Sequence, residues 1–198
     1  EYLKEALERD PGYALAWVEL SRAYSSQENF GWIPMAEGRA LAREAAKRAL
    51  ELGPDMAEAH ARMGKIQRSY DWDWRAAEAS YARALELEPR NAGALLGAAL
   101  MAGTMGRSEE QIRLTRRALE QDPLSVAAYH NLGIALRAAD RHAEAEAACR
   151  KALELAPQLG FARTGLASAL FAQGRLEEAF AETMRVPLEF WRLLALAI

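Results

Sequence analysis

The side chains best suited to bind a metal or attack a substrate are three histidines and a single cysteine. His60, His130 and His142 are too far apart to share one helical face, where a ligand pair needs a spacing of four residues. Cys149 has no base nearby in the sequence, as an activated nucleophile requires. It follows the apolar spacing of its segment, which is typical of a small buried side chain. We therefore expect no catalytic residue, no metal and no cofactor.

Residues 70–74 combine carboxylates with aromatic rings. Asp71 and Asp73 form an Asp-x-Asp pair that would suit a cation. The alternative, which we favour, is that they mark the end of one helix and the start of the next, where a carboxylate accepts free backbone N–H groups. Trp72 and Trp74 would suit an exposed binding surface, but we expect at least one of them to pack against a neighbouring helix.

Composition excludes several classes of protein. The chain of 198 residues has 25 basic and 28 acidic side chains, and a net charge of −3 gives no general attraction to nucleic acid. No apolar stretch reaches the ~18–20 residues of a membrane span, so we expect no direct membrane insertion. A single cysteine cannot form an internal disulfide. The chain is rich in Ala, Leu, Glu and Arg, which favour helices, and we expect an all-α fold.

The prolines reveal an internal repeat. Pro54, Pro89, Pro123 and Pro157 are 35, 34 and 34 residues apart, and each ends a phrase that begins Ala-Leu-Glu. A fifth copy of the phrase ends at Pro11. Because proline cannot continue a helix, each phrase predicts the end of a helix and a turn into the next unit.

Within each unit, apolar residues recur every three or four positions in two stretches, which predicts two amphipathic helices. The residues at fixed positions of the first helix are large and small in a set order. They are Trp17, Leu20, Ser21 and Tyr24 in one unit, Tyr129, Leu132, Gly133 and Leu136 in another, and Trp191, Leu194, Ala195 and Ile198 at the end. This pattern resembles the tetratricopeptide repeat (TPR), a family of 34-residue helix pairs.

The resemblance implies a right-handed superhelical α-solenoid of antiparallel helix pairs. We expect residues 1–198 to form a single solenoid fragment, and because the chain does not begin with Met, we expect it to be part of a longer protein. Its expected divisions are a partial repeat at 1–12, repeats at about 13–54, 55–89, 90–123, 124–157 and 158–187, and a partial repeat at 188–198.

Two repeats depart from the regular length. The first full repeat is about nine residues too long near residues 27–34, and the second has one extra residue near residues 70–74. The long insert followed by Trp72-Asp73-Trp74 resembles the TPR regions of bacterial multidomain regulators, such as winged-helix regulators and class III adenylate cyclases. That resemblance implies a cytoplasmic location, with the periplasm as the alternative.

In the TPR family, outward residues of the first helices line a concave groove that binds an extended peptide or a partner helix. Carried onto this chain, these positions form a basic early part and a largely apolar later part. The expected groove residues are Val18, Arg22, Arg62, Lys65, Arg68, Leu96, Leu100, His130, Asn131, Ile134, Arg137, Phe161 and Phe171. Neighbouring side chains covering these positions would be the alternative.

The resemblance therefore implies a non-enzymatic interaction scaffold whose partner is a protein or peptide segment. The alternative is the regulatory region of a larger enzyme or sensor with its catalytic domain outside this fragment. Because the first and last repeats are partial, apolar ends are expected to be uncovered and to allow self-association. These end residues are Leu3, Leu7, Leu193, Leu194, Leu196 and Ile198.

Overall fold

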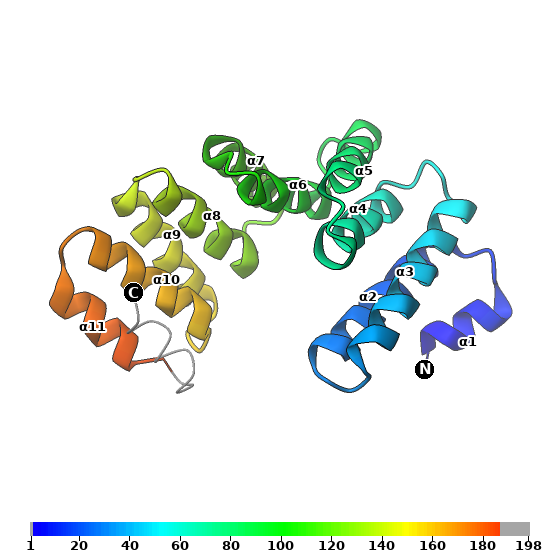
Figure 1. Cartoon of the computed structure of the whole chain (residues 1–198), viewed down its shortest axis with the longest axis horizontal. Helices are drawn as coiled ribbons and strands as arrows, with labels where there is room; N and C mark the ends of the chain where they lie inside the picture. The colour runs from blue at the N-terminus through cyan, green and yellow to red at the C-terminus, as the bar shows by residue number, and fades with distance from the viewer. Residues whose placement is uncertain (1, 187–198) are drawn as a thin grey trace. The chain divides into compact units, whose positions relative to one another are not determined.

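The structure, a computed structural model, describes residues 2–186, and every regular element within that range is a helix. The all-α fold class predicted from the sequence is confirmed (Figure 1). The chain divides into two compact units, residues 1–101 and 102–198. The predictions for residues 188–198, including the last partial repeat and its apolar end, lie outside the described residues.

Unit 1 consists of a short first helix followed by antiparallel pairs. Its elements are α1 (Tyr2–Arg9), α2 (Ala14–Asn29), α3 (Met35–Leu52), α4 (Ala57–Ile66), η1 (Gln67–Asp71) and α5 (Trp74–Leu87). Helix α6 (Ala92–Thr104) begins in this unit. Val18, Ala49 and Ala59 are fully buried where α2, α3 and α4 meet, and these small side chains let the three helices approach closely.

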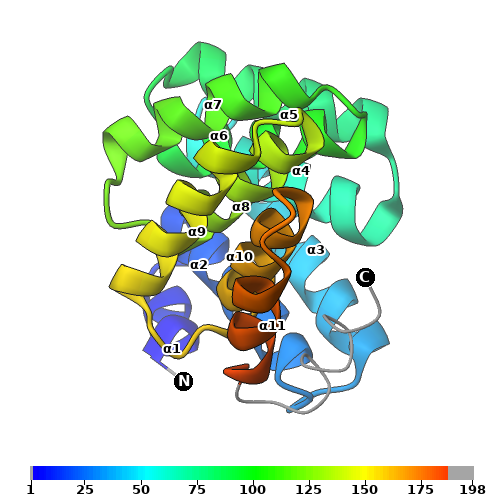
Figure 2. The ribbon, with the colours of Figure 1, turned by 90° about the vertical axis from the view of Figure 1, so that its left-hand side faces the viewer.

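Unit 2 continues the same alternation. Its helices are α7 (Ser108–Gln121), α8 (Val126–Ala138), α9 (His142–Leu155), α10 (Gly160–Ala172) and α11 (Leu176–Met184). Helix α10 packs against both α9 and α11 (Figures 1 and 2). Ile112, Leu132 and Leu136 form much of the core. Gly133 allows α8 to approach Cys149 of α9, because a Cβ there would lie 2.6 Å from its sulfur.

The nine extra residues of the first full repeat are absorbed mainly as helix. Helix α2 has 16 residues and α3 has 18, where α6 and α7 have 13 and 14. The turn between α2 and α3 adds only two residues to the length of the turn between α6 and α7. The turn exposes Phe30 and Trp32, whose rings stack with centroids 5.3 Å apart.

The single extra residue of the second repeat produces a π-helical turn at the end of α4. Residues Gln67–Asp71 form η1, and Trp72 follows in the left-handed conformation with φ 57°. A π turn accommodates one inserted residue without ending the helix. The carboxylate of Asp73 then caps α5 by accepting a hydrogen bond from the Ala76 N–H at 2.9 Å, as the capping interpretation predicts. Asp71 forms an ion pair with Arg43.

Two expectations about burial are wrong. Trp72 is 71% exposed and Trp74 is 39% exposed, so neither is buried as a wedge between helices. At the N-terminal end, Leu7 is buried and Leu3 half-buried, because α1 packs onto Trp17, Leu20 and Tyr24 of α2. The first partial repeat therefore does not present the uncovered leucine surface that was expected.

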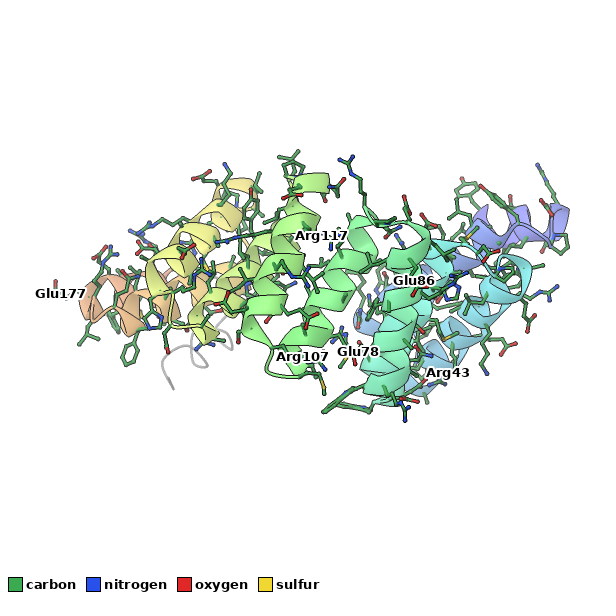
Figure 3. The ribbon with its side chains drawn as sticks, turned by 90° about the horizontal axis from the view of Figure 1, so that it is seen from above. Arg43, Glu78, Glu86, Arg107, Arg117 and Glu177 are labelled. Carbon is green, nitrogen blue, oxygen red and sulfur yellow. The ribbon has the colours of Figure 1, made fainter. Side chains whose placement is uncertain are left out.

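Charged side chains cover the outer sides of the helices, as Glu86 and Glu177 illustrate (Figure 3). Several form ion pairs, within one repeat as for Arg83 with Asp55 at 2.9 Å, or between consecutive repeats as for Arg116 with Glu144 at 2.9 Å. Because these side chains are solvent-exposed, each pair contributes only ~0.2–1 kcal/mol. These charged faces contribute mainly to solubility, while the small-residue contacts position the helices.

Candidate functional site

Six of the predicted groove residues meet around one cleft in unit 1, with a volume of about 330 Å³. They are Arg22, Arg62, Lys65, Arg68, Leu96 and Leu100. Ala61, Tyr81, Gly93 and Gly97 complete the lining. The cleft is therefore formed by α2, by α4 with η1, by α5 and by α6, and every lining residue belongs to unit 1.

One wall of the cleft carries four cationic side chains. Arg62, Lys65 and Arg68 follow one another at three-residue spacing, which places them on one face of α4 and its π-helical extension. Arg22 comes from α2, where it is half-exposed and pairs with Glu19 at 3.5 Å. None of the ten lining residues is acidic, so the positive charges gather without a carboxylate among them.

Arg62 is held rigidly by α2. Only 4% of it is exposed, and its Nε donates to the Ser21 hydroxyl at 2.6 Å while Nη2 donates to the Ser21 carbonyl at 2.6 Å. The same Nη2 also donates to the Ser25 hydroxyl. The Ser21 hydroxyl in turn donates to the Ala42 carbonyl of α3 at 2.6 Å. Three helices thus fix the position of one guanidinium group.

The network continues from Ser25 to the far end of the π turn. The Tyr70 hydroxyl donates to Ser25 at 2.7 Å and also lies 3.2 Å from a carboxylate oxygen of Glu28. Arg39 donates to that same carboxylate at 3.3 Å, and its guanidinium lies 5.0 Å above the Tyr70 ring. The π turn, which carries Arg68 and Tyr70, is consequently anchored to both α2 and α3.

Burial, and to a smaller extent the crowding of like charge, lowers the pKa of two cations of this wall. Burial, and then the charges of Arg62, Arg68 and Arg22, lower the pKa of Lys65. Burial also lowers the pKa of Arg62. Both directions show that the protein surroundings of these two cations disfavour the charged form.

Tyr81 of α5 lies beneath the cations and is 2% exposed. Burial raises its pKa, while a hydrogen bond and the charge from Arg68 act in the opposite direction. The Arg68 Nε is buried and has no hydrogen-bond partner among the described residues. Arg68 therefore lies beside the Tyr81 hydroxyl and keeps one donor unused.

The opposite wall belongs to α6 and is apolar. Leu96 and Leu100, one turn apart, are partly buried there. Gly97 lies directly against Tyr81, since a Cβ at this position would be 2.2 Å from the ring. Glycine therefore allows α6 to approach α5 and keeps Tyr81 in place under the arginines.

Burial corrects the interpretation of one groove residue. Val18 is fully buried against Ala49 and Ala59, so it belongs to the core and presents nothing to a ligand. The pattern places it outward because a standard repeat is assumed, whereas the longer α2 and α3 enclose this position. Arg62, expected one position from the line of the groove, does reach the cleft while remaining buried.

Unit 2 brings two of the predicted apolar residues together. The rings of His130 in α8 and Phe161 in α10 meet edge to face, with centroids 4.4 Å apart. Burial lowers the pKa of His130, and its Nδ1 has no hydrogen-bond partner among the described residues. Ile134, one turn further along α8, is 40% exposed. These side chains form a half-exposed apolar surface on α8 and α10.

The remaining predicted residues of unit 2 are spread more widely. Asn131 is half-buried and Arg137 is exposed on α8, while Phe171 is 51% exposed near the end of α10. Among the described residues, none of these three makes a ring contact, hydrogen bond or ion pair with the side chains of His130 and Phe161. The buried Cys149 lies near Arg137, but burial raises the pKa of its thiol to about 11, which keeps it protonated and unreactive.

Sequence reasoning missed the residues that support the cationic wall. Ser21 and Tyr81 occupy motif positions that are normally only packing positions, so nothing in the pattern marks them as polar supports. The one feature that could have pointed to Tyr81 is the pair of glycines packed against it, Gly64 and Gly97. A Cβ added at either glycine would lie within 3.0 Å of the Tyr81 ring. Close approach of two helices to one aromatic ring indicates a fixed ring.

Two searches of the described residues concern other kinds of site. Between residues 2 and 186, no group of three or more His, Cys, Asp or Glu side chains is arranged to hold a metal ion. Over the same part of the chain, no helix combines the length and the apolar character needed to cross a bilayer.

Comparison with known proteins supports the repeat assignment. Residues 126–159 match the tetratricopeptide repeat model, which covers α8 and α9. No curated protein sequence matches the chain. Solved structures of helical-repeat proteins do match it, so the TPR-type solenoid fold is shown by structure where sequence similarity is weak.

Three solved structures illustrate the similarity. YrrB, a TPR protein with an unusual peptide-binding site, is 17% identical with a TM-score of 0.68, over 100% of this chain and 99% of that one. PilW, a type IV pilus biogenesis factor, is 19% identical with a TM-score of 0.77, over 99% and 88%. PilF of Pseudomonas aeruginosa is 21% identical with a TM-score of 0.73, over 92% and 79%. At these identities the similarity concerns the fold alone.

Proposed function

We propose that this chain is a non-catalytic interaction module that holds an extended segment of a partner protein in the cleft of unit 1. The cationic wall is the observation that supports this function most directly. Three arginines and a lysine line a cleft with no acidic side chain in its lining, beside an apolar wall. Such a surface favours a segment that combines acidic and apolar residues.

The apolar surface of unit 2 supplies a second contact area for the same class of ligand. Phe161 and Ile134 present partly exposed apolar groups, and Phe171 is half-exposed. Aromatic side chains that bury against a partner contribute strongly to affinity, and losing such an anchor costs ~2 kcal/mol or more. Exposed ion pairs contribute less, at ~0.2–1 kcal/mol each, and act mainly on association rate and salt dependence.

The test begins with a peptide array that varies acidic and apolar content independently. Peptides selected on the array are then measured against the wild type, Lys65→Glu and Phe161→Ala, with unchanged helicity confirmed by circular dichroism. Arg75→Glu is the matched control, because Arg75 is an exposed residue of α5 that does not line the cleft.

We expect Lys65→Glu to weaken the binding of acidic peptides and to reduce the salt dependence of that binding. Arg75→Glu should have little effect on either. Phe161→Ala is expected to weaken the binding of peptides that carry apolar anchor residues. Selected peptides that bind all four proteins equally would refute the cleft as the binding site, and the exposed Phe30–Trp32 turn would be the next surface to test.

A further inference from the structure

The charge of the cleft exceeds what a single carboxylate would balance. Arg22, Arg62, Lys65 and Arg68 contribute four positive charges. Among the described acidic residues outside the lining, Glu19 pairs with Arg22, and Glu28, which pairs with Arg39, also acts on Lys65. A bound carboxylate carries one negative charge, so most of the excess would remain. A phosphate monoester carries close to two negative charges near neutral pH and has three strong acceptor oxygens.

The donors of the cleft suit several acceptor oxygens at once. The Arg62 guanidinium is fixed in place by Ser21 and Ser25. Arg68 lies beside Tyr81 and keeps its Nε without a partner among the described residues. Lys65 adds an ammonium group with three donors. Arginine forks match phosphate geometry well, and charge-assisted hydrogen bonds of this kind are about twice as strong as neutral ones.

The apolar wall of the cleft favours a ligand whose anionic group is attached to an apolar part. Leu96, Leu100 and Ala61 face the space beside the cations. Gly93 is exposed, and a Cβ there would meet only the Asn91 side chain, at 3.4 Å, so the cleft is open at this side. The volume of about 330 Å³ exceeds the size of a free oxyanion. An anionic head on an apolar stem fits this combination.

We propose that the cleft is a subsite for a phosphorylated side chain on an apolar stem, carried by the partner segment. This inference rests on the proposed function and specifies the chemistry of its ligand. The cations bind the phosphate group, and the wall formed by α6 contacts the stem. A segment that places a single carboxylate in the cleft would balance only one of its four positive charges.

Three small probes test the inference with the chain as it is. Phenyl phosphate, phenyl sulfate and benzoate share the ring but differ in charge and shape, and isothermal titration at about pH 7.5 compares a dianion with two monoanions. We expect one site that prefers phenyl phosphate over both others by about tenfold or more, since one additional charge-assisted hydrogen bond is worth about that factor.

Variants locate the site. Arg68→Gln and Arg22→Gln are each expected to lower the affinity for phenyl phosphate by about tenfold, because each removes one charge-assisted hydrogen bond. Arg22 is exposed enough that its replacement leaves the fold intact. Arg75→Gln, with the same charge change outside the cleft, is the control and is expected to bind normally.

The source of the phosphate is tested with a peptide pair and a nucleotide. A phosphotyrosine peptide is expected to bind more tightly than its unphosphorylated form and more tightly than AMP. Equal binding of the three small probes, or of the two peptides, would overturn the phosphate subsite and leave the proposed acidic-segment function standing. Tighter binding of AMP than of the phosphopeptide would overturn both, because the ligand would then be a nucleotide.

Discussion

Replacing glycine by alanine should change the stability of the protein in opposite directions at two positions of α6, Gly97 and Gly93. At Gly97 a Cβ would lie 2.2 Å and 2.6 Å from two ring carbons of Tyr81, whose ring is buried and cannot move aside. At Gly93 a Cβ would meet only the Asn91 side chain, at an ordinary 3.4 Å. Both positions are helical, so alanine gains up to ~1 kcal/mol of helix propensity at each.

The expected difference follows from these distances. Overpacking a well-filled core costs ~1–3 kcal/mol, and the severity of the clash at Gly97 favours the upper part of that range. We expect Gly97→Ala to destabilise the protein by ~1–2 kcal/mol after the gain in propensity, and Gly93→Ala to be neutral or stabilising by up to ~1 kcal/mol. The two variants should therefore differ by ~1–3 kcal/mol.

Urea unfolding followed by circular dichroism measures this difference directly. A Tyr81→Ala background provides the control, because Gly97→Ala should lose most of its cost once the ring is absent. Equal stability of Gly97→Ala and Gly93→Ala in the wild-type background would refute the close contact between α5 and α6. Gly97→Ala should also weaken phenyl phosphate binding, since displacing the Tyr81 ring would disturb Arg68 beside it.

Further substitutions test other parts of the structure. Ser21→Ala removes the hydroxyl that accepts from the buried Arg62 Nε and donates to the Ala42 carbonyl, and should cost ~1–3 kcal/mol in urea unfolding. Trp72→Gly should stabilise the protein by up to ~1 kcal/mol in the same assay, because Trp72 is exposed and left-handed at φ 57°. Cys149, with a buried thiol of pKa about 11, should react with a thiol reagent only as the protein unfolds, so native labelling should be slow and denaturant should accelerate it.

The helix pairs were predictable because proline and apolar spacing act locally. Each Ala-Leu-Glu phrase ends a helix one or two residues before its proline, as at Leu52 before Pro54 and Leu155 before Pro157. The extra residues were also visible in the sequence, but their structural form was not. Whether an insertion lengthens a helix or a loop depends on what the added turns pack against, and that is a property of the neighbouring repeat.

The site was predictable only in its charge. Arg22, Lys65 and Arg68 stand at outward positions of the repeat, so their proximity follows from stacking alone. The burial of Val18 does not, because it depends on α3 and α4 closing over a lengthened α2. The role of Tyr81 could not be predicted either, because a ring that only fills the core and a ring that lies beside an arginine have the same sequence pattern.

The burial of Arg62 argues that the cleft serves a purpose other than stability. A buried guanidinium loses favourable hydration, and apolar side chains of similar size are often as stable or more stable at such places. The surrounding helices contain mostly alanine and glycine at their contacts, so they offer little packing in compensation. Ser21, Ser25 and Ala42 nevertheless supply hydrogen bonds that hold this one charge beside Lys65 and Arg68. The Arg62 charge is costly to bury, and hydrogen bonds from neighbouring helices hold it in place. It contributes most to ligand binding, where the ligand supplies the missing negative charge.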